Sequence, residues 1–223
     1  MKIGLFGGTF DPIHWGHLRS AEEVREAFSL DRVLFVPASN PPHKKIRPRT
    51  SARDRFEMVR LAISRNSGFS LSDVELLRRG KSYSIDTVRY FARRESPKNS
   101  LYFILGLDAF REIDSWKDIQ EIFPLCHLIV TSRPGSGDTL SLKYIPVAVR
   151  RGVCYDPRKN AFRHKSGTYF FFTRITDIAI SASEIRNRVR GGKSIHYLVP
   201  QEVETYIKKK GLYRGRQEER PQD

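Results

Sequence analysis

Short apolar runs alternate with amphipathic stretches along the amino-terminal part of the chain. Uninterrupted apolar runs bounded by turn residues are typical of strands that are buried on both faces. Such runs occupy residues 2–6, 32–36, 101–105 and 127–131. Apolar residues spaced three and four apart are typical of helices with one buried face, and they recur after Gly16, Ser51 and Tyr83. This alternation of strands and helices predicts an α/β fold with a parallel sheet.

The remaining segments are less regular. Residues 38–49 are rich in proline and basic residues and predict a mobile loop. Between 133 and 168, seven glycines and prolines interrupt the periodicity, so we expect a variable surface region with one short strand at 145–149. Weaker patterns predict a strand at 69–74, a helix around 116–123, a last sheet strand at 169–173, and helices at 183–190 and 200–210.

The chain shows no internal repeat and no composition shift that would mark a linker. We therefore expect a single domain over residues 1–214, whose C-terminal part, about 181–214, is helical. The last residues, 215–223, contain no apolar side chain and predict a disordered tail.

Charge is the unusual feature of the composition. Forty Lys and Arg against 25 Asp and Glu give a formal net charge of +15, which favours anionic partners, either nucleic acid or phosphorylated small molecules. The basic residues are spread along the chain, whereas a dedicated nucleic-acid arm is usually compact. No aromatic RNA-binding motif, zinc pattern or basic helix with interleaved aromatics supports a nucleic-acid-binding protein, which stays the alternative from another class.

The hydrophobic content, the apolar runs and the cysteines exclude further classes of protein. The 223 residues are 39% hydrophobic, which excludes wholesale disorder. No apolar run approaches the ~18 residues that span a bilayer, and the N-terminus lacks a signal peptide's long apolar stretch. Cys126 and Cys154 have neither a disulfide framework nor metal-ligand spacing, so we expect two reduced thiols and a cytoplasmic protein without membrane contact.

The segment 7–17, Gly-Gly-Thr-Phe-Asp-Pro-Ile-His-Trp-Gly-His, carries the strongest chemical signal. It lies where the first strand gives way to the first helix, and ligands of open parallel sheets bind at such ends of strands. Gly7 and Gly8 lack side chains, so backbone amides there can approach a phosphate closely. His17 falls at the helix N-terminus, where the dipole favours an anion. The segment is neither a P-loop nor a GxGxxG fingerprint.

The two histidines of this segment allow three interpretations. His14 and His17 can contact phosphates, hold a metal ion together with Asp11, or serve as capping and core residues. A histidine taken singly is more often structural. A pair that flanks Gly16 directly after a strand and a glycine turn favours phosphate contacts, so we predict no protein-held metal site.

A second phosphate site is predicted near the C-terminus. Ser183 can cap the helix that carries Arg186, and Arg186 then falls one turn inside it. Free amides, the hydroxyls of Ser181 and Ser183, and a guanidinium can together meet one phosphate. The plainer interpretation is an ordinary helix cap with a surface arginine.

These motifs resemble a known family. His14-x-Gly16-His17 is similar to the HxGH signature of the nucleotidyltransferase superfamily, and residues 7–14 resemble the bacterial nicotinate-nucleotide adenylyltransferases in particular. The similarity covers about residues 3–214. Further matching motifs, in the family's order, lie at 40–44 (NPPHK), 83–88 (YSIDTV), 106–108 (GLD), Trp116, 132–135 (SRPG), 180–186 (ISASEIR), 197–200 (YLVP) and 211–213 (GLY).

The chain departs from the family's pattern in two places. Ser84 stands where many members have threonine, which is conservative if only its backbone amide is used. The region 136–167 matches poorly, which leaves contacts made from that region open.

The resemblance implies a doubly wound, mainly parallel, Rossmann-like nucleotidyltransferase fold with a small helical C-terminal extension. It implies adenylyl transfer from ATP to nicotinate mononucleotide, which gives deamido-NAD and pyrophosphate, with Mg²⁺ accompanying ATP and held chiefly by phosphates and water. The partners expected are these two substrates, without nucleic acid or membrane, and self-association of the chain stays open. The nearest rivals are pantetheine-phosphate adenylyltransferases and cytidylyltransferases, which are usually shorter.

The resemblance also assigns residues. Those that act in catalysis are His14, His17, Lys44 and Arg186. Those that bind ATP are Gly7, Gly8, Thr9, Phe10, His14, Gly16, His17, Gly106, Asp108, Arg133, Ser181, Ser183 and Arg186. Those that bind nicotinate mononucleotide are Thr9, His43, Lys44, Tyr83, Ser84, Thr87, Asp108, Trp116 and Lys117. In this assignment Trp116 stacks on the nicotinate ring, and the amides of Ser84 and Lys117, near helix starts, hold its carboxylate.

Overall fold

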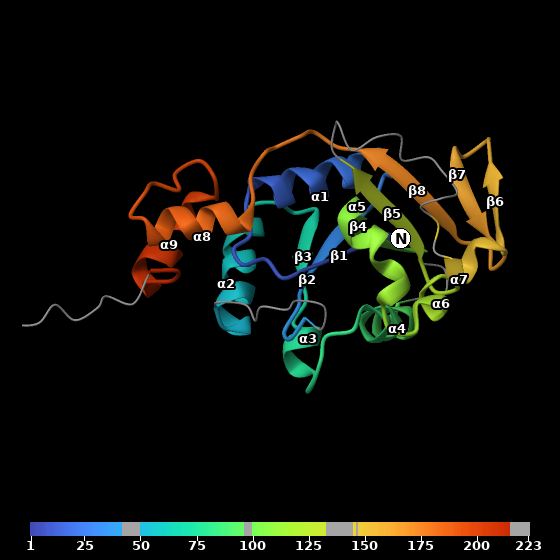
Figure 1. The fold of residues 1–223 in the computed structure, drawn as a ribbon, viewed down its shortest axis with the longest axis horizontal. Coiled ribbons are helices and arrows are strands. Elements are labelled where there is room, and N and C mark those ends of the chain that lie inside the picture. Colours follow the sequence, from blue (N-terminus) through green and yellow to red (C-terminus); the bar gives the residue numbers. More distant parts are fainter. Residues whose placement is uncertain (42–49, 96–99, 133–144, 146, 215–223) are drawn as a thin grey trace, which may run out of the picture.

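A twisted sheet of parallel strands forms the centre of the molecule (Figure 1). The computed structural model describes residues 1–41, 50–95, 100–132, 145 and 147–214. Within these residues one sheet of eight strands has the order β3-β2-β1-β4-β5-β8-β7-β6. The strands are β1 (Lys2–Gly8), β2 (Arg32–Pro37), β3 (Phe69–Leu71), β4 (Ser100–Gly106), β5 (His127–Ser132), β6 (Val153–Asp156), β7 (Ala161–His164) and β8 (Tyr169–Arg174).

Helices cover both faces of this sheet, which makes the fold doubly wound. The α-helices are α1 (Trp15–Ala27), α2 (Ala52–Ile63), α3 (Val74–Leu77), α4 (Ser84–Arg94), α5 (Leu107–Arg111), α6 (Ile119–Ile122), α7 (Val147–Arg150), α8 (Ala182–Arg190) and α9 (Gln201–Lys210). A 3-10 turn, η1, covers Ile113–Ser115. Among the described segments, no helix has the length and apolar character needed to cross a bilayer.

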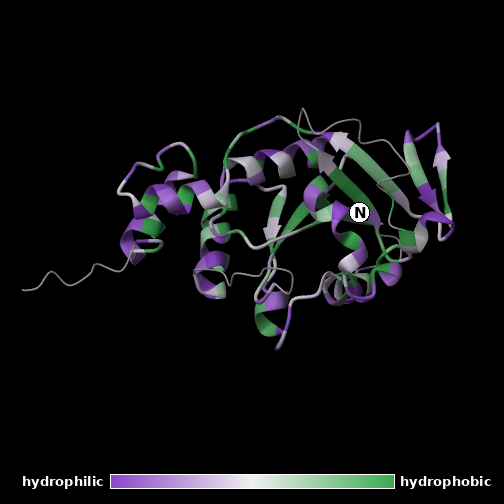
Figure 2. Cartoon of the chain, in the orientation of Figure 1, coloured by the Kyte–Doolittle hydropathy of each residue, from purple (hydrophilic) through white to green (hydrophobic). Residues whose placement is uncertain are grey.

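The two faces of the sheet carry two separate cores. Along β1 and β4, Ile3, Leu5 and Phe103 pack toward α4, α5 and α6, whereas Phe6 and Ile104 pack toward α1 and α2. This alternation is what period-two side-chain geometry requires of strands buried on both faces. In Figure 2 the central strands are largely green, the colour of hydrophobic residues, whereas the helices carry both hydrophobic and hydrophilic residues. The predicted α/β class and mainly parallel sheet are confirmed.

The C-terminal helices α8 and α9 extend one end of the molecule beside α2 (Figure 1). Ile185, Val203 and Ile207 share a buried cluster with Met58 and Val59 of α2. The helix predicted at 200–210 is α9, which follows its N-cap residue Pro200 and is capped at its C-terminus by Gly211, whose φ of 62° is left-handed. The division into one domain and a tail stays a prediction, and residues 215–223 lie outside the described chain.

The region 145–168 corrects the sequence analysis most strongly. The predicted strand at 145–149 is wrong, because residues 147–150 form α7. Two strands that were not predicted, β6 and β7, pair antiparallel and continue the sheet beyond β8. Both strands are only four residues long, and one residue of their connecting turn, Asn160, has a φ of 46°. Such short strands leave too few positions for a hydrophobic period to emerge.

Two smaller predictions also need correction. The strand predicted at 69–74 ends at Leu71, and the chain then turns into α3. The helix predicted around 116–123 covers only Ile119–Ile122, because Asp118 has a left-handed φ of 49° and breaks the run after Trp116.

Candidate functional site

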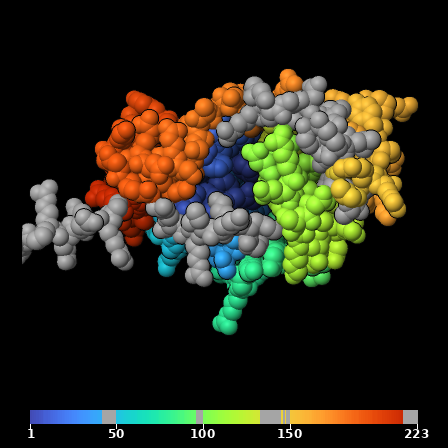
Figure 3. All heavy atoms as spheres, in the orientation of Figure 1, coloured from blue at the N-terminus to red at the C-terminus, as the bar shows by residue number. Residues whose placement is uncertain are grey.

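The carboxyl ends of the central strands open into a cleft. Because β1, β4 and β5 are parallel, their last residues meet at one edge of the sheet. A cleft of about 390 Å³ lies there and is lined by Phe6, Gly7, Gly8, Phe10, His14, Gly16, His17, Ser20, Gly106, Leu107, Asp108, Thr131, Ser132 and Ile175. In Figure 3 the blue N-terminal segment is visible at the bottom of a hollow between the orange C-terminal helices and the green segment of α5.

Two glycines of the 7–17 segment are required by close packing. A Cβ atom on Gly8 would lie 2.7 Å from the ring of Phe10, and one on Gly16 would lie 3.1 Å from the ring of His14. Phe10 itself has a φ of 48°, so its ring folds back over the turn. The glycines therefore let the aromatic side chains pack against the turn and leave the backbone exposed to the cleft.

The two histidines form one unit at the start of α1. His14 is the N-cap residue, and its amide donates a hydrogen bond to Nδ1 of His17 at 3.3 Å. The two rings lie 3.7 Å apart at an angle of 30°, and Phe10 packs edge-on against His17 at 5.1 Å. His14 is buried, whereas His17 is half-buried and also lines the cleft. This packing holds the His17 ring in one orientation toward the cleft.

Asp11 connects segments that lie far apart in the sequence. Its Oδ1 accepts hydrogen bonds from the hydroxyl of Thr50 at 2.7 Å and from that of Tyr213 at 2.8 Å. Its backbone carbonyl accepts one from the guanidinium of Arg186 at 2.7 Å. Among the described residues no three histidine, cysteine or acidic side chains gather as metal ligands. The arrangement therefore gives Asp11 a structural partner set.

Burial and the Asp11 charge raise the pKa of Tyr213 far above its ordinary range, so this hydroxyl stays protonated and serves as a donor.

Arg55 stabilises the glycine turn through hydrogen bonds to backbone carbonyls. This arginine of α2 is almost fully buried, and its guanidinium donates to the carbonyls of Thr9 at 2.9 Å, Ser39 at 3.0 Å and Ala38. Burial lowers the pKa of Arg55, while the charge of Asp11 opposes that shift. One cation thus joins the turn after β1 to the chain leaving β2.

A second pocket shares one wall with the cleft. It has a volume of about 270 Å³ and is lined by Phe6, Gly7, Gly8, Thr9, Val36, Ala38, Pro41, Glu75, Ser82, Ser84, Phe103, Ile104, Leu105, Gly106, Ala109, Glu112 and Trp116. Ser84 is the first residue of α4, so its amide is one of the unpaired donors at that helix start. Trp116 packs edge-on against Phe103 at 6.1 Å and is half-buried.

Many predicted site residues line one or both hollows. Those in the cleft are Gly7, Gly8, Phe10, His14, Gly16, His17, Gly106 and Asp108. Those in the second pocket are Gly7, Gly8, Thr9, Ser84, Gly106 and Trp116. His43, Lys44 and Arg133 lie outside the described residues. Six of the described predicted residues line neither hollow: Tyr83, Thr87, Lys117, Ser181, Ser183 and Arg186.

One predicted detail is corrected. Ser181, and not Ser183, caps α8, because the Ser181 hydroxyl accepts from the amide of Glu184 at 3.1 Å. Ser183 instead accepts from Arg186 at 3.0 Å. Lys117 lies in the turn directly before the N-cap residue of α6, with its ammonium 4.8 Å from the ring centre of Tyr83.

Thr87 lies behind the pocket wall rather than in it. It is buried, and its hydroxyl donates to Glu75 at 2.7 Å while accepting from Arg78 at 3.3 Å.

Sequence reasoning missed Arg55, Glu75 and the contacts of Asp11. Arg55 and Glu75 sit in helices as ordinary charged residues, and no local pattern marks them as buried. Tyr213 belongs to the 211–213 motif, so its presence was noticed but its partner was not. Their partners lie up to 202 positions away in the chain, and spacing along one segment cannot predict such contacts.

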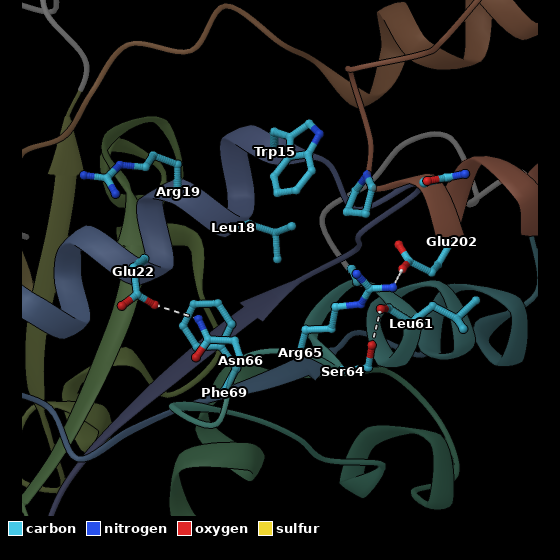
Figure 4. A pocket seen from close by; sticks show the side chains of 13 residues that line it. Trp15, Leu18, Arg19, Glu22, Leu61, Ser64, Arg65, Asn66, Phe69 and Glu202 are labelled. Atoms are coloured by element: carbon cyan, nitrogen blue, oxygen red, sulfur yellow. Dashed lines mark hydrogen bonds and ion pairs between the residues drawn. The ribbon is translucent and has the colours of Figure 1, made fainter.

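Trp15, the variable position inside the HxGH motif, faces a different pocket (Figure 4). This hollow lies between α1, α2 and the start of α9, with a volume of about 490 Å³. Leu18, Leu61 and Phe69 form its apolar lining, and an ion pair between Arg65 and Glu202 at 2.8 Å lies at its edge. The motif thus presents His17 to the cleft and the tryptophan to the opposite side of α1.

Comparisons with known proteins agree with this geometry. The family model described as cytidylyltransferase-like matches residues 5–188. A protein of Geobacter sp. (strain M21) named "Probable nicotinate-nucleotide adenylyltransferase" is 48% identical over 213 residues, which cover 96% of this chain and 98% of that protein. A protein of the same name from Syntrophotalea carbinolica is 45% identical and covers 97% and 99%.

Among solved structures, the fold is similar to that of Plasmodium falciparum nicotinic acid mononucleotide adenylyltransferase complexed with NaAD. That match has a TM-score of 0.72 at 19% identity and covers 95% of this chain and 97% of that one. At this identity the likeness concerns the fold alone, and it confirms the nucleotidyltransferase fold. Together with the sequence relatives, it shows that the chain belongs to the nicotinate-nucleotide adenylyltransferase family of the cytidylyltransferase-like nucleotidyltransferases.

Proposed function

We propose that this protein transfers the adenylyl group of ATP to nicotinate mononucleotide, giving deamido-NAD and pyrophosphate in NAD biosynthesis. The observation that carries the proposal is that two hollows meet at one glycine turn. Phe6, Gly7, Gly8 and Gly106 line both the histidine cleft and the tryptophan pocket. Two nucleotides bound one on each side would therefore bring their phosphates together over Gly7 and Gly8.

The reaction requires the protein mainly to position the two substrates and to stabilise negative charge. The attacking group is the 5′-phosphate of nicotinate mononucleotide, which is already an anion, so no general base is needed. One of its oxygens bonds to the α-phosphorus of ATP while the bond from that phosphorus to pyrophosphate breaks. Catalysis of such transfers is mostly alignment and electrostatic stabilisation. The described site offers backbone amides, a helix start and the histidine pair for that purpose.

We assign His17 and His14 to the transferring phosphate and Arg186 to the triphosphate. His17 lines the cleft at the N-terminus of α1, and Arg186 reaches the loop of the histidines through the carbonyl of Asp11. Lys44 and His43 are assigned to the phosphates, Arg133 to the adenosine, and Ser181 and Ser183 to the triphosphate on the family resemblance alone.

For the acceptor, we assign Trp116 to stacking on the nicotinate ring and the Ser84 amide to its carboxylate. Both line the second pocket, and the amide lies at the positive end of α4. A site made of N–H donors can bond both carboxylate oxygens but leaves an amide NH₂ facing other donors. Nicotinate mononucleotide should therefore be preferred over nicotinamide mononucleotide.

Mg²⁺ is proposed as a companion of ATP. Mg²⁺ keeps several waters and is often bound through substrate phosphates with one or two carboxylates. Asp108 has the only carboxylate among the described residues that line the cleft, and its Oδ1 lies 3.5 Å from Nη1 of Arg111. This donor set would fit an ion carried mainly by the triphosphate, to which Asp108 could add one carboxylate ligand. A cytoplasmic location and self-association stay predictions of the sequence.

Pyrophosphate release tests the function directly. The purified protein is given ATP and Mg²⁺ with nicotinate mononucleotide, nicotinamide mononucleotide or phosphopantetheine, and the dinucleotide product is identified by mass. We expect release with nicotinate mononucleotide at the highest kcat/KM. Higher efficiency with phosphopantetheine, or transfer from CTP in place of ATP, would assign the chain to another branch of the superfamily.

A further inference from the structure

The acceptor pocket contains a buried carboxyl group that the proposed reaction leaves without a role. Glu75 of α3 lines this pocket and is only 7% exposed. Its Oε1 accepts a hydrogen bond from Thr87 at 2.7 Å, whereas its Oε2 has no hydrogen-bond partner among the described residues. An unpaired buried oxygen makes the ionised carboxylate costly, so an added negative charge nearby can shift the group toward its protonated form. Protonation of Oε2 removes that charge.

The charges around Glu75 are few and come from three directions. Arg78, which follows α3, reaches the same threonine at 3.3 Å. Arg55 faces it from α2, but its guanidinium is already bonded to backbone carbonyls. Glu112, at the end of α5, lines the same pocket and adds a negative charge there. No described cation pairs directly with the Glu75 carboxyl group.

We propose that Glu75 is a specificity-determining residue that takes up a proton when nicotinate mononucleotide binds. The proposal rests on the proposed function and deepens it. A neutral Glu75 leaves the nicotinate carboxylate unopposed in the pocket. An ionised Glu75 repels that carboxylate but does not repel the neutral amide of nicotinamide. The protonation state of one buried side chain therefore shifts the choice between the two acceptors.

The direction of the pKa shift of Glu75 in the free protein supports proton uptake on binding. Burial raises the pKa of Glu75 above its ordinary value, and the hydrogen bond from Thr87 and the charge of Arg78 oppose this shift. A second carboxylate entering the pocket raises it further, because two like charges in one site resist joint ionisation. Binding of the acid is thus linked to proton uptake, whereas binding of the amide is not.

The first experiment uses the wild-type protein alone. Binding of each mononucleotide is measured by calorimetry at pH 7.5 in buffers of different ionisation enthalpy, which gives the protons taken up on binding. Both ligands carry the same 5′-phosphate, so its contribution cancels in the difference between them. We expect more uptake with nicotinate mononucleotide than with the nicotinamide form. Equal uptake by the two ligands would overturn the proposal without any variant.

The second experiment follows the acceptor preference with pH. The ratio of kcat/KM for the two acceptors is measured from pH 6 to 9 in the wild type, Glu75→Gln and Asp73→Asn. We expect the wild-type preference for the acid to fall by about tenfold or more as Glu75 ionises. Glu75→Gln, which is neutral at every pH, keeps the preference constant. Asp73→Asn removes an exposed charge next to the same helix and follows the wild type.

The outcomes separate this proposal from the proposed function. A wild-type protein that uses neither mononucleotide refutes the function itself. A protein that prefers nicotinate mononucleotide, but whose Glu75→Gln variant keeps the wild-type pH dependence, refutes only the role of Glu75. The raised pKa of Glu75 means that its ionised form lowers the free energy of unfolding at pH values above the ordinary glutamate pKa. Glu75→Gln, which carries no charge, should therefore be at least as stable as the wild type at neutral pH.

Discussion

Removal of a single hydroxyl from Tyr213 tests how the C-terminus supports the catalytic loop. Tyr213 is 8% exposed, and its hydroxyl donates to Oδ1 of Asp11 at 2.8 Å. Tyr213→Phe keeps the ring packed in the same buried cluster and deletes only this donor. Thr50 still donates to the same oxygen, so Asp11 loses one of its two hydroxyl partners.

The size of the effect follows from the charge on the acceptor. A hydrogen bond to an ionised group contributes roughly 1.5–3 kcal/mol, and the retained Thr50 bond favours the lower part of that range. We therefore expect a loss of about 2 kcal/mol. For a domain of this size, 1 kcal/mol lowers Tm by roughly 2–4 °C, so Tyr213→Phe should lower Tm by about 4–8 °C.

The dependence on pH gives a second, independent readout. Because burial and Asp11 raise the pKa of Tyr213, the stability from its protonated form is fully present below the ordinary tyrosine pKa of about 10. That stability is lost as pH rises from there toward the folded-state value. The Tm difference between wild type and Tyr213→Phe should therefore be constant from pH 7 to 9 and shrink above about pH 10.

Thermal unfolding followed by circular dichroism measures both effects, with Tyr197→Phe as the control. Tyr197 is 81% exposed, so its variant should match the wild type. Thr50→Val and the double variant complete a cycle, in which the two substitutions should be non-additive because both donors share one oxygen. A Tyr213→Phe variant as stable as the control would refute the view that this hydroxyl anchors the loop.

Three further substitutions test other parts of the site. His17→Ala should lower kcat by about 10²-fold or more while the protein stays folded, because the substitution removes a donor to the transferring phosphate. The exposed His196→Ala should keep the wild-type kcat, and near-normal turnover of folded His17→Ala would exclude the phosphate role. Arg186→Ala should raise the KM for ATP more than that for the mononucleotide, and an equal rise would mean that its bond to Asp11 supports both sites. Arg55→Met should destabilise the fold by at least about 3 kcal/mol in urea unfolding, since three backbone carbonyls lose a charged donor; a smaller loss would mean that water replaces it.

The central sheet was predictable because its strands are buried on both faces. Continuous apolar runs such as those of β1 and β4 have no other common explanation when turn residues bound them. The strands β6 and β7 gave no such signal, since they are short and carry exposed residues such as Cys154 and Arg163. Their place in the sheet depends on the pairing of β7 with β8 and of β6 with β7, and not on their own composition.

Some residues of the candidate site could likewise be predicted from the sequence, whereas others could not. The glycine turn and the histidine pair form one local segment, so their spacing alone indicated a phosphate site. Ser183 was assigned as the cap of α8 because both serines fit the pattern, and only the hydrogen bond to Glu184 identifies Ser181. Arg55 and Glu75 could not be predicted as site residues, because a charged residue in a helix is usually solvated and nothing local marks these two as buried.

These buried residues explain why a short motif is not a site by itself. Arg55 donates a hydrogen bond to the Thr9 carbonyl of the segment 7–17. Thr50, Arg186 and Tyr213 donate hydrogen bonds to Asp11 of the same segment. Each of these bonds ends on the backbone or the one carboxylate of the loop, and none uses the histidines. The loop can therefore be fixed firmly while the His17 ring remains available to the cleft, which is what electrostatic preorganisation toward a transferring phosphate requires. The motif supplies the chemistry, and residues up to 202 positions away supply its geometry.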